Sequence, residues 1–506
     1  MSKKYNFSYN KAMSQKKVLI IGAGISGLSA GVYAARSGFD VTILEQHYIV
    51  GGLSTAWSRK GYYFEGGMHW LTGSSPKLKL NQIWKEIGAL QENNPIENRD
   101  PYYTLLDGDK KLCMYRDIKK LEKHFIEYAP EDKRMIKRMC RDVRYFKNVH
   151  LPVNDVSGLK SKTHIHPSLG ELIKMAPAAL RYSYLQKTSY LDYVNQFKNE
   201  NIRHLLLCVI GHRYNAISFI YTLASFASGD CGYPEGGSIR MANNILEKYK
   251  ALGGKIEFRC KVENVEIEEG IVKGVTTKDG FIPADAVIVT QDTRNAIDNL
   301  FDPPLYEDPW VGKMRRDIIS EQTMFISLGV KADLSRFPFA TIFPLKKPFE
   351  YADCKYTEFR INNYSKYKDH APEGCTTLTC LLISDNYWFW KNAKEDGSYK
   401  AKKEELGRKF VEVLSSFIPE VKDNLEVIDV ATPCTYERYC TCYEGGWMSV
   451  WNKDGKQDNY PQELDSVWGL YFAGQRIMMP GGLPIAVYTG RRAVQLLCRN
   501  EGEIFV

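Results

Sequence analysis

Three glycines near the start of the chain, Gly22, Gly24 and Gly27, constrain the fold more than any other feature. They follow a short apolar run at 17–21, typical of a buried parallel strand, and precede a helical pattern at 28–37. In such a turn the first glycine permits the sharp bend, the second lets backbone approach a pyrophosphate, and the third lets the helix pack against the strand. This order predicts a βαβ unit that binds a dinucleotide.

An acidic residue, Glu45, ends a second predicted strand at 39–44. A carboxylate there can accept hydrogen bonds from both ribose hydroxyls and disfavours a 2′-phosphate, so we expect no NADP at this site. The pyrophosphate would sit at the helix N-terminus, where free N–H groups favour negative charge. Ile25, Ser26 and Gln46 flank these positions, and we include them among the predicted cofactor contacts.

A glycine pair follows the acid and distinguishes FAD from NAD. Gly51 and Gly52 precede Leu53 and Ser54, and a second pair ends at Gly67. Paired glycines let the main chain run along the cofactor, and small residues beyond can reach the flavin. A flexible loop would explain this segment alone equally well.

A third segment near the end of the chain serves the flavin. A predicted strand at 467–472 leads to Gly474 and Gln475, and a glycine turn then brings a helix N-terminus toward the ring. N–H groups there would stabilise negative charge on a reduced flavin. The predicted contacts are Leu483, Pro484 and Ile485, and the final helix is expected over 490–499.

These segments resemble the amine-oxidase-like flavoprotein superfamily, and most closely its phytoene desaturase, carotenoid isomerase and retinol saturase group. The segments that carry the resemblance are 22–45, 51–69, 233–237, 287–292 and 469–492. The resemblance implies non-covalent FAD, with Val262 beside the adenine. The chain departs from the pattern at Leu53, where many members carry arginine, and at Gln475, where many carry aspartate.

The expected fold class is α/β: a discontinuous Rossmann-type FAD-binding domain with a second, mixed α+β substrate domain. The FAD domain is predicted over 1–100, 231–295 and 461–506, and the substrate domain over 101–230 and 296–460. Residues 81–230 are expected to be mostly helical, with helices within 121–145 and 169–197. The apolar window 205–227 contains His212 and Arg213, so burial is favoured over a membrane span.

The resemblance implies chemistry at carbon–carbon double bonds of a polyene- or isoprenoid-like substrate: desaturation, saturation or cis–trans isomerisation. No second glycine fingerprint follows a strand, so electrons would pass to or from a quinone, oxygen or a redox protein. His69 is the first catalytic candidate because a histidine can move a proton near neutral pH, with Tyr436 and Trp447 as further ones. A flavin amine oxidase and a non-catalytic FAD-binding protein are the alternatives.

Composition sets broader limits. A formal charge of +8 over 506 residues, without a long basic run, does not call for nucleic acid. The 12 cysteines match no zinc or disulfide framework, no metal-ligand cluster stands out, and the N-terminal segment lacks a signal-peptide pattern. We therefore expect a reduced, cytoplasmic protein. A helical stretch at 169–191 could lie on a membrane surface or pack against the domain.

Overall fold

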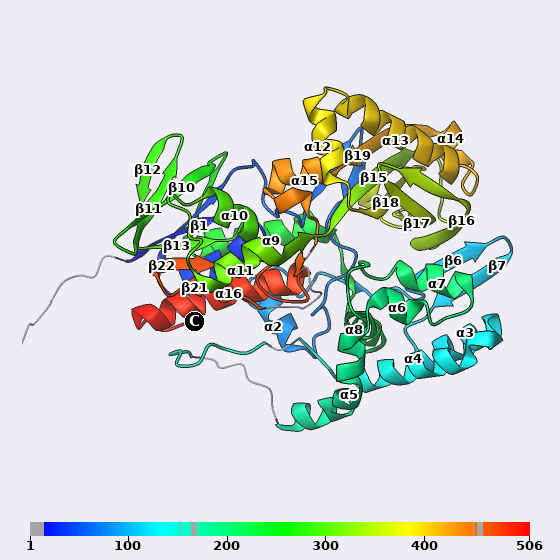
Figure 1. Ribbon diagram of the computed structural model, residues 1–506, viewed down its shortest axis with the longest axis horizontal. Coiled ribbons are helices and arrows are strands. Elements are labelled where there is room, and N and C mark those ends of the chain that lie inside the picture. The colour runs from blue at the N-terminus through cyan, green and yellow to red at the C-terminus, as the bar shows by residue number, and fades with distance from the viewer. Residues whose placement is uncertain (1–14, 152, 163–168, 449, 453–458) are drawn as a thin grey trace, which may run out of the picture.

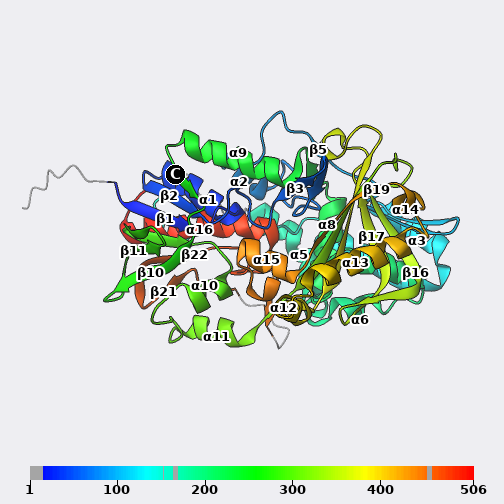
Figure 2. The same ribbon diagram turned by 90° about the horizontal axis from the view of Figure 1, so that it is seen from above.

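The computed structural model describes residues 15–151, 153–162, 169–448, 450–452 and 459–506. Figure 1 shows two sheets side by side, with a layer of helices beneath the second sheet. The view from above in Figure 2 shows α16 running under the first sheet toward the middle of the molecule. This division into two halves sets up a site between them.

The first sheet is assembled from three distant parts of the chain. Its central strands are parallel, and their order is β10-β11-β22-β13-β1-β2-β9. The strands are β1 (Lys17–Ile21), β2 (Asp40–Glu45), β9 (Lys255–Phe258), β10 (Val262–Glu268), β11 (Ile271–Thr277), β12 (Gly280–Pro283), β13 (Ala286–Val289), β21 (Glu463–Leu464) and β22 (Val467–Phe472). The discontinuous Rossmann-type domain predicted from the sequence is confirmed.

Helices cover both faces of this sheet. On one face lie α1 (Ile25–Arg36), α2 (Lys79–Glu86), α9 (Gly237–Ala251) and α16 (Gly482–Glu501), and on the other α10 (Thr293–Asn299) and α11 (Pro309–Asp317). A Cβ on Gly490 would stand 2.3 Å from the carbonyl oxygen of Ser26, so a bare glycine lets α16 cross α1 closely. The last helix begins at Gly482, earlier than the predicted 490, because Pro484 falls in its first turn, where no N–H bond is lost.

The second sheet forms the other half. Its order is β19-β15-β18-β17-β16-β6-β7. The strands are β6 (Tyr103–Asp107), β7 (Lys110–Met114), β15 (Gln322–Val330), β16 (Ala340–Tyr351), β17 (Cys354–Asn363), β18 (Thr376–Ser384) and β19 (Leu425–Ala431). The hairpin β6–β7 lies inside the stretch predicted to be mostly helical. Its turn places Gly108 at a φ of 56°, a conformation typical of short hairpins.

The helical layer is α3 (Ile118–Tyr128), α4 (Lys133–Phe146), α5 (Leu169–Lys187), α6 (Tyr190–Val194), α7 (Glu200–Leu207) and α8 (Ala216–Ala227). The predicted helix at 121–145 is broken at Ala129–Pro130, where the proline starts a new turn. The one at 169–197 is broken where Ser189 caps α6. The window 205–227 is largely buried in α7 and α8, as expected. No described helix has the length and apolar character to cross a bilayer.

The remaining elements complete the second half and join the two. The helices α12 (Tyr387–Glu395), α13 (Tyr399–Leu414) and α14 (Glu420–Asp423) cover the second sheet, and α15 (Pro433–Cys440) stands between the halves (Figure 1). Short paired strands are β3 (Ala56–Arg59) with β4 (Tyr62–Glu65), β5 (Ile96–Glu97) with β8 (Tyr233–Pro234), and β14 (Ile318–Ser320) with β20 (Val450–Asn452).

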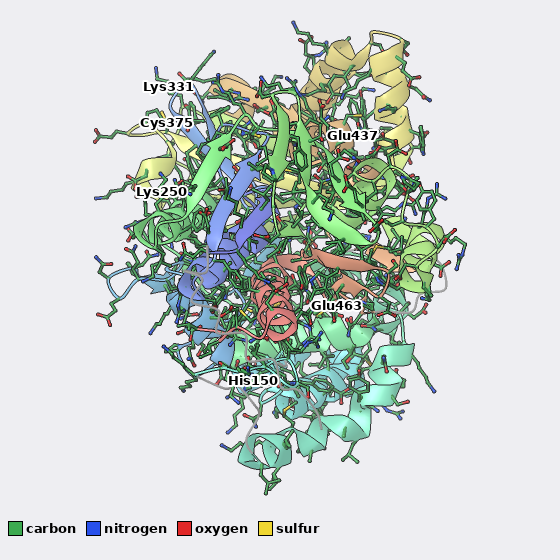
Figure 3. The ribbon with its side chains drawn as sticks, turned by 90° about the vertical axis from the view of Figure 1, so that its left-hand side faces the viewer. His150, Lys250, Lys331, Cys375, Glu437 and Glu463 are labelled. Atoms are coloured by element: carbon green, nitrogen blue, oxygen red, sulfur yellow. The ribbon has the colours of Figure 1, made fainter. Side chains whose placement is uncertain are left out.

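Figure 3 looks at the molecule from the side of the first sheet. The helix α16 is seen nearly end-on, and Glu463 is labelled beside it. Glu463 pairs with Arg499 of this helix at 2.7 Å, which fixes the C-terminal end of α16 to the sheet edge. His150 lies lower in this view, between the sheet and the helical layer. The loop that carries His150 therefore borders the space between the two halves.

Candidate active site

Two cavities meet between the halves of the molecule. A groove of about 490 Å³ runs along the carboxyl ends of β1 and β2, and we call it the dinucleotide groove. A cavity of about 900 Å³, the apolar cavity, lies between the helical layer and the second sheet. Both are lined by the same five residues, which we call the junction: Gly67, Trp447, Met448, Gly482 and Leu483.

The turn between β1 and α1 shapes the floor of the groove. Gly22 has a φ of 99°, and a Cβ on Gly27 would stand 1.9 Å from the Gly22 carbonyl oxygen. A Cβ on Gly24 would meet only the Gly51 carbonyl oxygen, at 4.0 Å. Gly24 caps α1 without a side-chain hydrogen bond, so the first N–H groups of the helix remain available to a phosphate. Gly27 has a packing role and does not line the groove.

Glu45 is 7% exposed and lines the groove at the end of β2. Its two carboxylate oxygens accept hydrogen bonds from the N–H groups of Ala23 (2.7 Å) and His47 (2.8 Å). Each oxygen has a second lone pair, which can accept a ribose hydroxyl. Glu45 therefore both holds the glycine turn in place and faces the predicted ribose position, whereas the sequence indicated only the second role.

Two buried hydroxyls test whether the groove fits FAD. The Oγ atoms of Ser26 and Ser54 are buried and have no hydrogen-bond partner among the described residues. Both residues line the groove, and such an orphaned donor is unfavourable unless a ligand accepts from it. Ser26 lies in the first turn of α1, where a pyrophosphate would be expected. The groove therefore fits an anionic dinucleotide.

The N-terminus of α16 points at the junction. Gly481 caps this helix without a side-chain bond, and Gly482 donates its N–H to Oε1 of Gln475 at 3.1 Å. The amide of Gln475 in turn contacts the carbonyl oxygen of Trp447 at 3.4 Å. Gln475 therefore ties the helix terminus to the loop that carries Trp447, which an aspartate, lacking a side-chain N–H, could not do in the same way.

The remaining predicted contacts divide into two groups. Those that line the groove are Gln46, Gly51, Gly52, Leu53, Val262 and Gly474. Pro484 lines only the apolar cavity, whereas Ile485 and Tyr436 line neither. The Tyr436 side chain lies near Cys440 and Cys442 at the groove edge, and burial raises the pKa of its hydroxyl.

The groove wall contains a buried ion pair that was not predicted from the sequence. The Nε atom of Arg476 lies 2.8 Å from Oδ2 of Asp292, and the two side chains are only 3% and 1% exposed. Nη2 of Arg476 donates to the carbonyl oxygen of Gly446 at 2.7 Å, while Nη1 has no described partner. Both residues line the groove. Their positions, directly after Gln475 and shortly after β13, were the available signal.

Glu65 was also not predicted from the sequence, and it holds the backbone of the junction residue Gly67 in place. This carboxylate is 1% exposed and accepts the N–H groups of Gly67 and Met68, both at 3.0 Å, and of Ser238 at 2.8 Å. It therefore fixes the glycine segment to the N-terminus of α9, where a negative charge is favourable.

His69 lines the apolar cavity next to the junction, and its ring centroid lies 6.2 Å from that of Trp447. Burial first, and then the charges of Arg360 and Arg99, lower its pKa well below the ordinary value. The imidazole is therefore neutral at neutral pH. Its Nε2 lies 3.4 Å from Nη2 of Arg360 and its Nδ1 lies 3.5 Å from Nδ2 of Asn362, and a neutral imidazole can accept at one of the two nitrogens.

The walls of the apolar cavity come from several elements. The helix α5 contributes aliphatic and aromatic side chains, namely Leu172, Met175, Ala176, Ala178, Ala179 and Tyr182. The loop between α7 and α8 contributes Cys208 to His212, and β17 contributes Lys355, Tyr356, Glu358 and Arg360. The cavity is therefore apolar toward α5 and polar along β17.

The chain is similar to known flavin-dependent proteins over almost its whole length. The family described as flavin containing amine oxidoreductase matches residues 25–498. An all-trans-retinol 13,14-reductase of Danio rerio is 23% identical over 94% of this chain and 85% of its own length. A lycopene-forming phytoene desaturase of Pseudescherichia vulneris is 23% identical over 96% and 99%. A chloroplastic prolycopene isomerase of Daucus carota is 23% identical over 93% and 78%.

Solved structures show the same fold. An oxidoreductase from Methanosarcina mazei has a TM-score of 0.57 at 17% identity, over 95% of this chain and 100% of its own. A putrescine oxidase bound to putrescine has a TM-score of 0.61 at 16% identity, over 96% and 99%.

Proposed function

From the premise that this chain belongs to the flavin containing amine oxidoreductase family and is an FAD-dependent oxidoreductase, we propose that it acts on carbon–carbon double bonds of a hydrophobic, polyene-like substrate. The observation that carries the proposal is a cavity of about 900 Å³ that meets the dinucleotide groove at the junction. A long apolar substrate fits such a cavity. The reductase, desaturase and isomerase relatives support chemistry at alkenes.

The residues of the chain would position the cofactor and the substrate for this chemistry. FAD, when bound, supplies hydride transfer, and the protein supplies orientation and electrostatics. Glu45, Ser26 and the turn at Gly24 would hold the ribose and phosphate groups, and the α16 N-terminus would face the flavin. The apolar walls would limit water at the junction, and His69, held neutral, would add no charge there.

The test is the absorption spectrum of the purified protein during anaerobic reduction, followed by addition of a panel of polyenes and enones. Flavin bands that bleach and then return on adding a substrate would establish saturation. Bands that stay bleached while the polyene spectrum shifts would establish isomerisation, and bleaching of oxidised flavin by a polyene would establish desaturation. A flavin that exchanges electrons with no alkene would contradict the proposal and favour a non-catalytic role.

A flavin amine oxidase is the second candidate, since the putrescine oxidase shares the fold. The cavity argues against it. The guanidinium of Arg360 lines this cavity and lies 3.4 Å from His69, and its positive charge opposes a protonated amine. Peroxide release on adding putrescine or cyclohexylamine to the oxidised protein would reverse this ranking.

The electron partner is proposed to be external: a quinone, oxygen or a small redox protein. The described residues include one glycine-rich dinucleotide groove, which the FAD occupies in this proposal. Stopped-flow reoxidation of the reduced flavin by a soluble quinone and by oxygen, at equal concentrations, compares two of these partners. Reoxidation by NADP⁺ faster than by either would contradict an external acceptor of this kind.

We further propose that the protein binds the cytoplasmic face of a membrane through α5. Leu169, Leu172, Ile173 and Leu180 are 74%, 50%, 65% and 81% exposed on this helix, which lies at the lower margin of the molecule in Figure 1. The same helix lines the apolar cavity. The neighbouring α4 exposes Lys133, Arg134, Lys137 and Arg141, so the surface combines apolar and basic character, as anionic lipid requires.

Flotation with vesicles of phosphatidylcholine and phosphatidylglycerol tests this contact. The wild type should float with the vesicles, and Ile173→Glu with Leu180→Glu should remain at the bottom of the gradient. Phe281→Glu is the matched control, because Phe281 is 52% exposed on β12, in the other half of the molecule. Equal flotation of all three proteins would contradict a role for α5.

A further inference from the structure

Arg360 occupies a position in the apolar cavity that the proposed function does not explain. It lies on β17, lines the cavity and is partly buried. Its Nη1 donates to the carbonyl oxygen of Cys208 at 2.8 Å, and its Nη2 lies 3.4 Å from Nε2 of His69. The ring of Tyr103 is 6.0 Å away. All three partners are neutral, although a partly buried guanidinium usually pairs with a carboxylate.

The other ionised residues of the cavity wall already have partners. Lys355 is 62% exposed and lies 3.3 Å from Glu350. Glu358 accepts from Thr357 at 2.6 Å and lies 2.8 Å from Nδ1 of His204. Among the described residues no carboxylate forms an ion pair with Arg360. The part of the cavity beside His69 therefore holds a guanidinium that pairs with no described carboxylate.

We propose that Arg360 binds an anionic oxygen group of the substrate, and that this group is a carboxylate conjugated to the polyene. Guanidinium has five N–H donors in a planar fork. The carbonyl of Cys208, the ring of His69 and the hydroxyl of Tyr103 engage three of them, so donors remain for a carboxylate. The apolar chain would then extend along the walls toward α5, where Leu172 and Met175 line the cavity. This inference rests on the proposed function and names the substrate class of the same site.

The position of Arg360 also selects which double bond is presented to the flavin. Arg360 touches His69, and the His69 ring lies 6.2 Å from the Trp447 ring at the junction. A head group bound by Arg360 therefore places the nearest alkene carbons, conjugated with the carboxylate, at the junction. A substrate held the other way round would have its head group at Lys355, in the exposed part of β17.

The test compares all-trans-retinoic acid, whose carboxylate is conjugated to its polyene, with its methyl ester, using quenching of the fluorescence of the FAD-loaded protein. The wild type should bind the acid at least about tenfold more tightly than the ester, which corresponds to about 1.4 kcal/mol. Arg360→Met should remove this preference, and Arg360→Lys should retain part of it. Lys355→Met, a cation on the same strand that is exposed and already paired, should leave the preference intact.

The outcomes separate this inference from the proposed function. Equal affinities for acid and ester in the wild type would overturn it without any variant. So would a preference that Arg360→Met retains, or one that only Lys355→Met removes, because the head group would then lie elsewhere. Redox inertness of the flavin toward all polyenes would contradict the proposed function, yet the acid-to-ester ratio would still report on Arg360.

Discussion

The dinucleotide groove and the apolar cavity share the junction, yet they are built in opposite ways. The groove is formed mainly by backbone: glycine turns, two uncapped helix termini and a few short side chains such as Ser26 and Ser54. The cavity is formed by side chains from α5, β17 and the loop after α7. The groove therefore tolerates little change at its glycines, whereas the cavity can alter its specificity through single side chains.

The groove and the cavity also differ in how their charged side chains are paired. In the groove, Glu45 accepts hydrogen bonds from backbone N–H groups, and Arg476 forms an ion pair with Asp292. In the cavity, Arg360 lacks an anionic partner and His69 is held neutral. The cofactor region therefore relies on backbone N–H groups, whereas the substrate region holds one guanidinium without an anionic partner. The following predictions test this contrast.

The largest effect is expected from Gly27→Ala. Its Cβ would stand 1.9 Å from a backbone oxygen that cannot move without opening the β1–α1 turn. We expect destabilisation of roughly 3 kcal/mol or more and loss of bound FAD. Urea unfolding and the flavin-to-protein absorbance ratio measure both. Gly170→Ala is the control, since a Cβ there meets nothing within 4 Å; equal effects of the two variants would refute the packing explanation.

Glu45→Ala should weaken FAD binding about a hundredfold, or about 2.7 kcal/mol. It removes a charged acceptor and leaves the N–H groups of Ala23 and His47 without their partner. Glu45→Gln, which keeps one acceptor oxygen, should lose less. Fluorescence titration of the apoprotein with FAD gives the affinities. A variant that keeps wild-type affinity would remove Glu45 from the cofactor site.

The pH dependence of stability should arise in the substrate half. Burial lowers the pKa of His370 to about 4, from 6.5 in the unfolded chain. Because the folded pKa is depressed and the protonated form is the charged one, the unfolded state binds more protons between these values. Stability therefore falls as the pH drops below 6.5, by roughly 1–2 kcal/mol for this residue at pH 5, and is unaffected above it.

His370→Phe tests this assignment. Neither ring nitrogen of His370 has a described hydrogen-bond partner, and the ring stacks on Tyr364 with centroids 4.8 Å apart, so phenylalanine preserves the packing. The difference between the unfolding free energies at pH 7 and pH 5 should shrink by the amount given above. An unchanged difference would assign the pH dependence to other groups, with His69 as the first to examine.

The smallest effect is expected from Ser26→Ala. Its Oγ has no protein partner, so the apoprotein should keep its stability, while FAD affinity falls about fivefold, or about 1 kcal/mol. Ser29→Ala is the matched control on the same helix. Ser29 donates to the carbonyl oxygen of Val487 at 2.8 Å and does not line the groove, so this variant should lower stability and leave affinity unchanged. The reverse pattern would contradict the predicted phosphate contact.

The sequence predicted the groove far better than the cavity. Gly22, Gly24 and Glu45 lie within one short segment, so their spacing alone places them on one turn and the adjacent strand end. Arg476 and Asp292 share the groove but are distant in sequence, and only their places after Gln475 and after β13 could have indicated them. In the cavity the sequence predicted His69 and Trp447. The structure places Trp447 in the junction and His69 next to it.

The prediction was least accurate where tertiary contacts overrule local pattern. The hairpin β6–β7 lies in a stretch whose composition indicated helix, because it extends the second sheet through pairing with β16. The pKa of His69 could not be anticipated either, since it is lowered first by burial and then by Arg360 and Arg99, which come from distant elements. Both differences have one cause: the partners are far away along the chain.

The sequence by itself therefore determined the cofactor and the class of fold, because short-range spacing of glycines and one acid fixes the geometry of a dinucleotide turn. Tertiary structure alone decided the shape and charge of the substrate region. There, α5, β17 and the junction meet across long chain separations, and burial together with neighbouring charges sets the protonation of His69 and leaves Arg360 without an anionic partner.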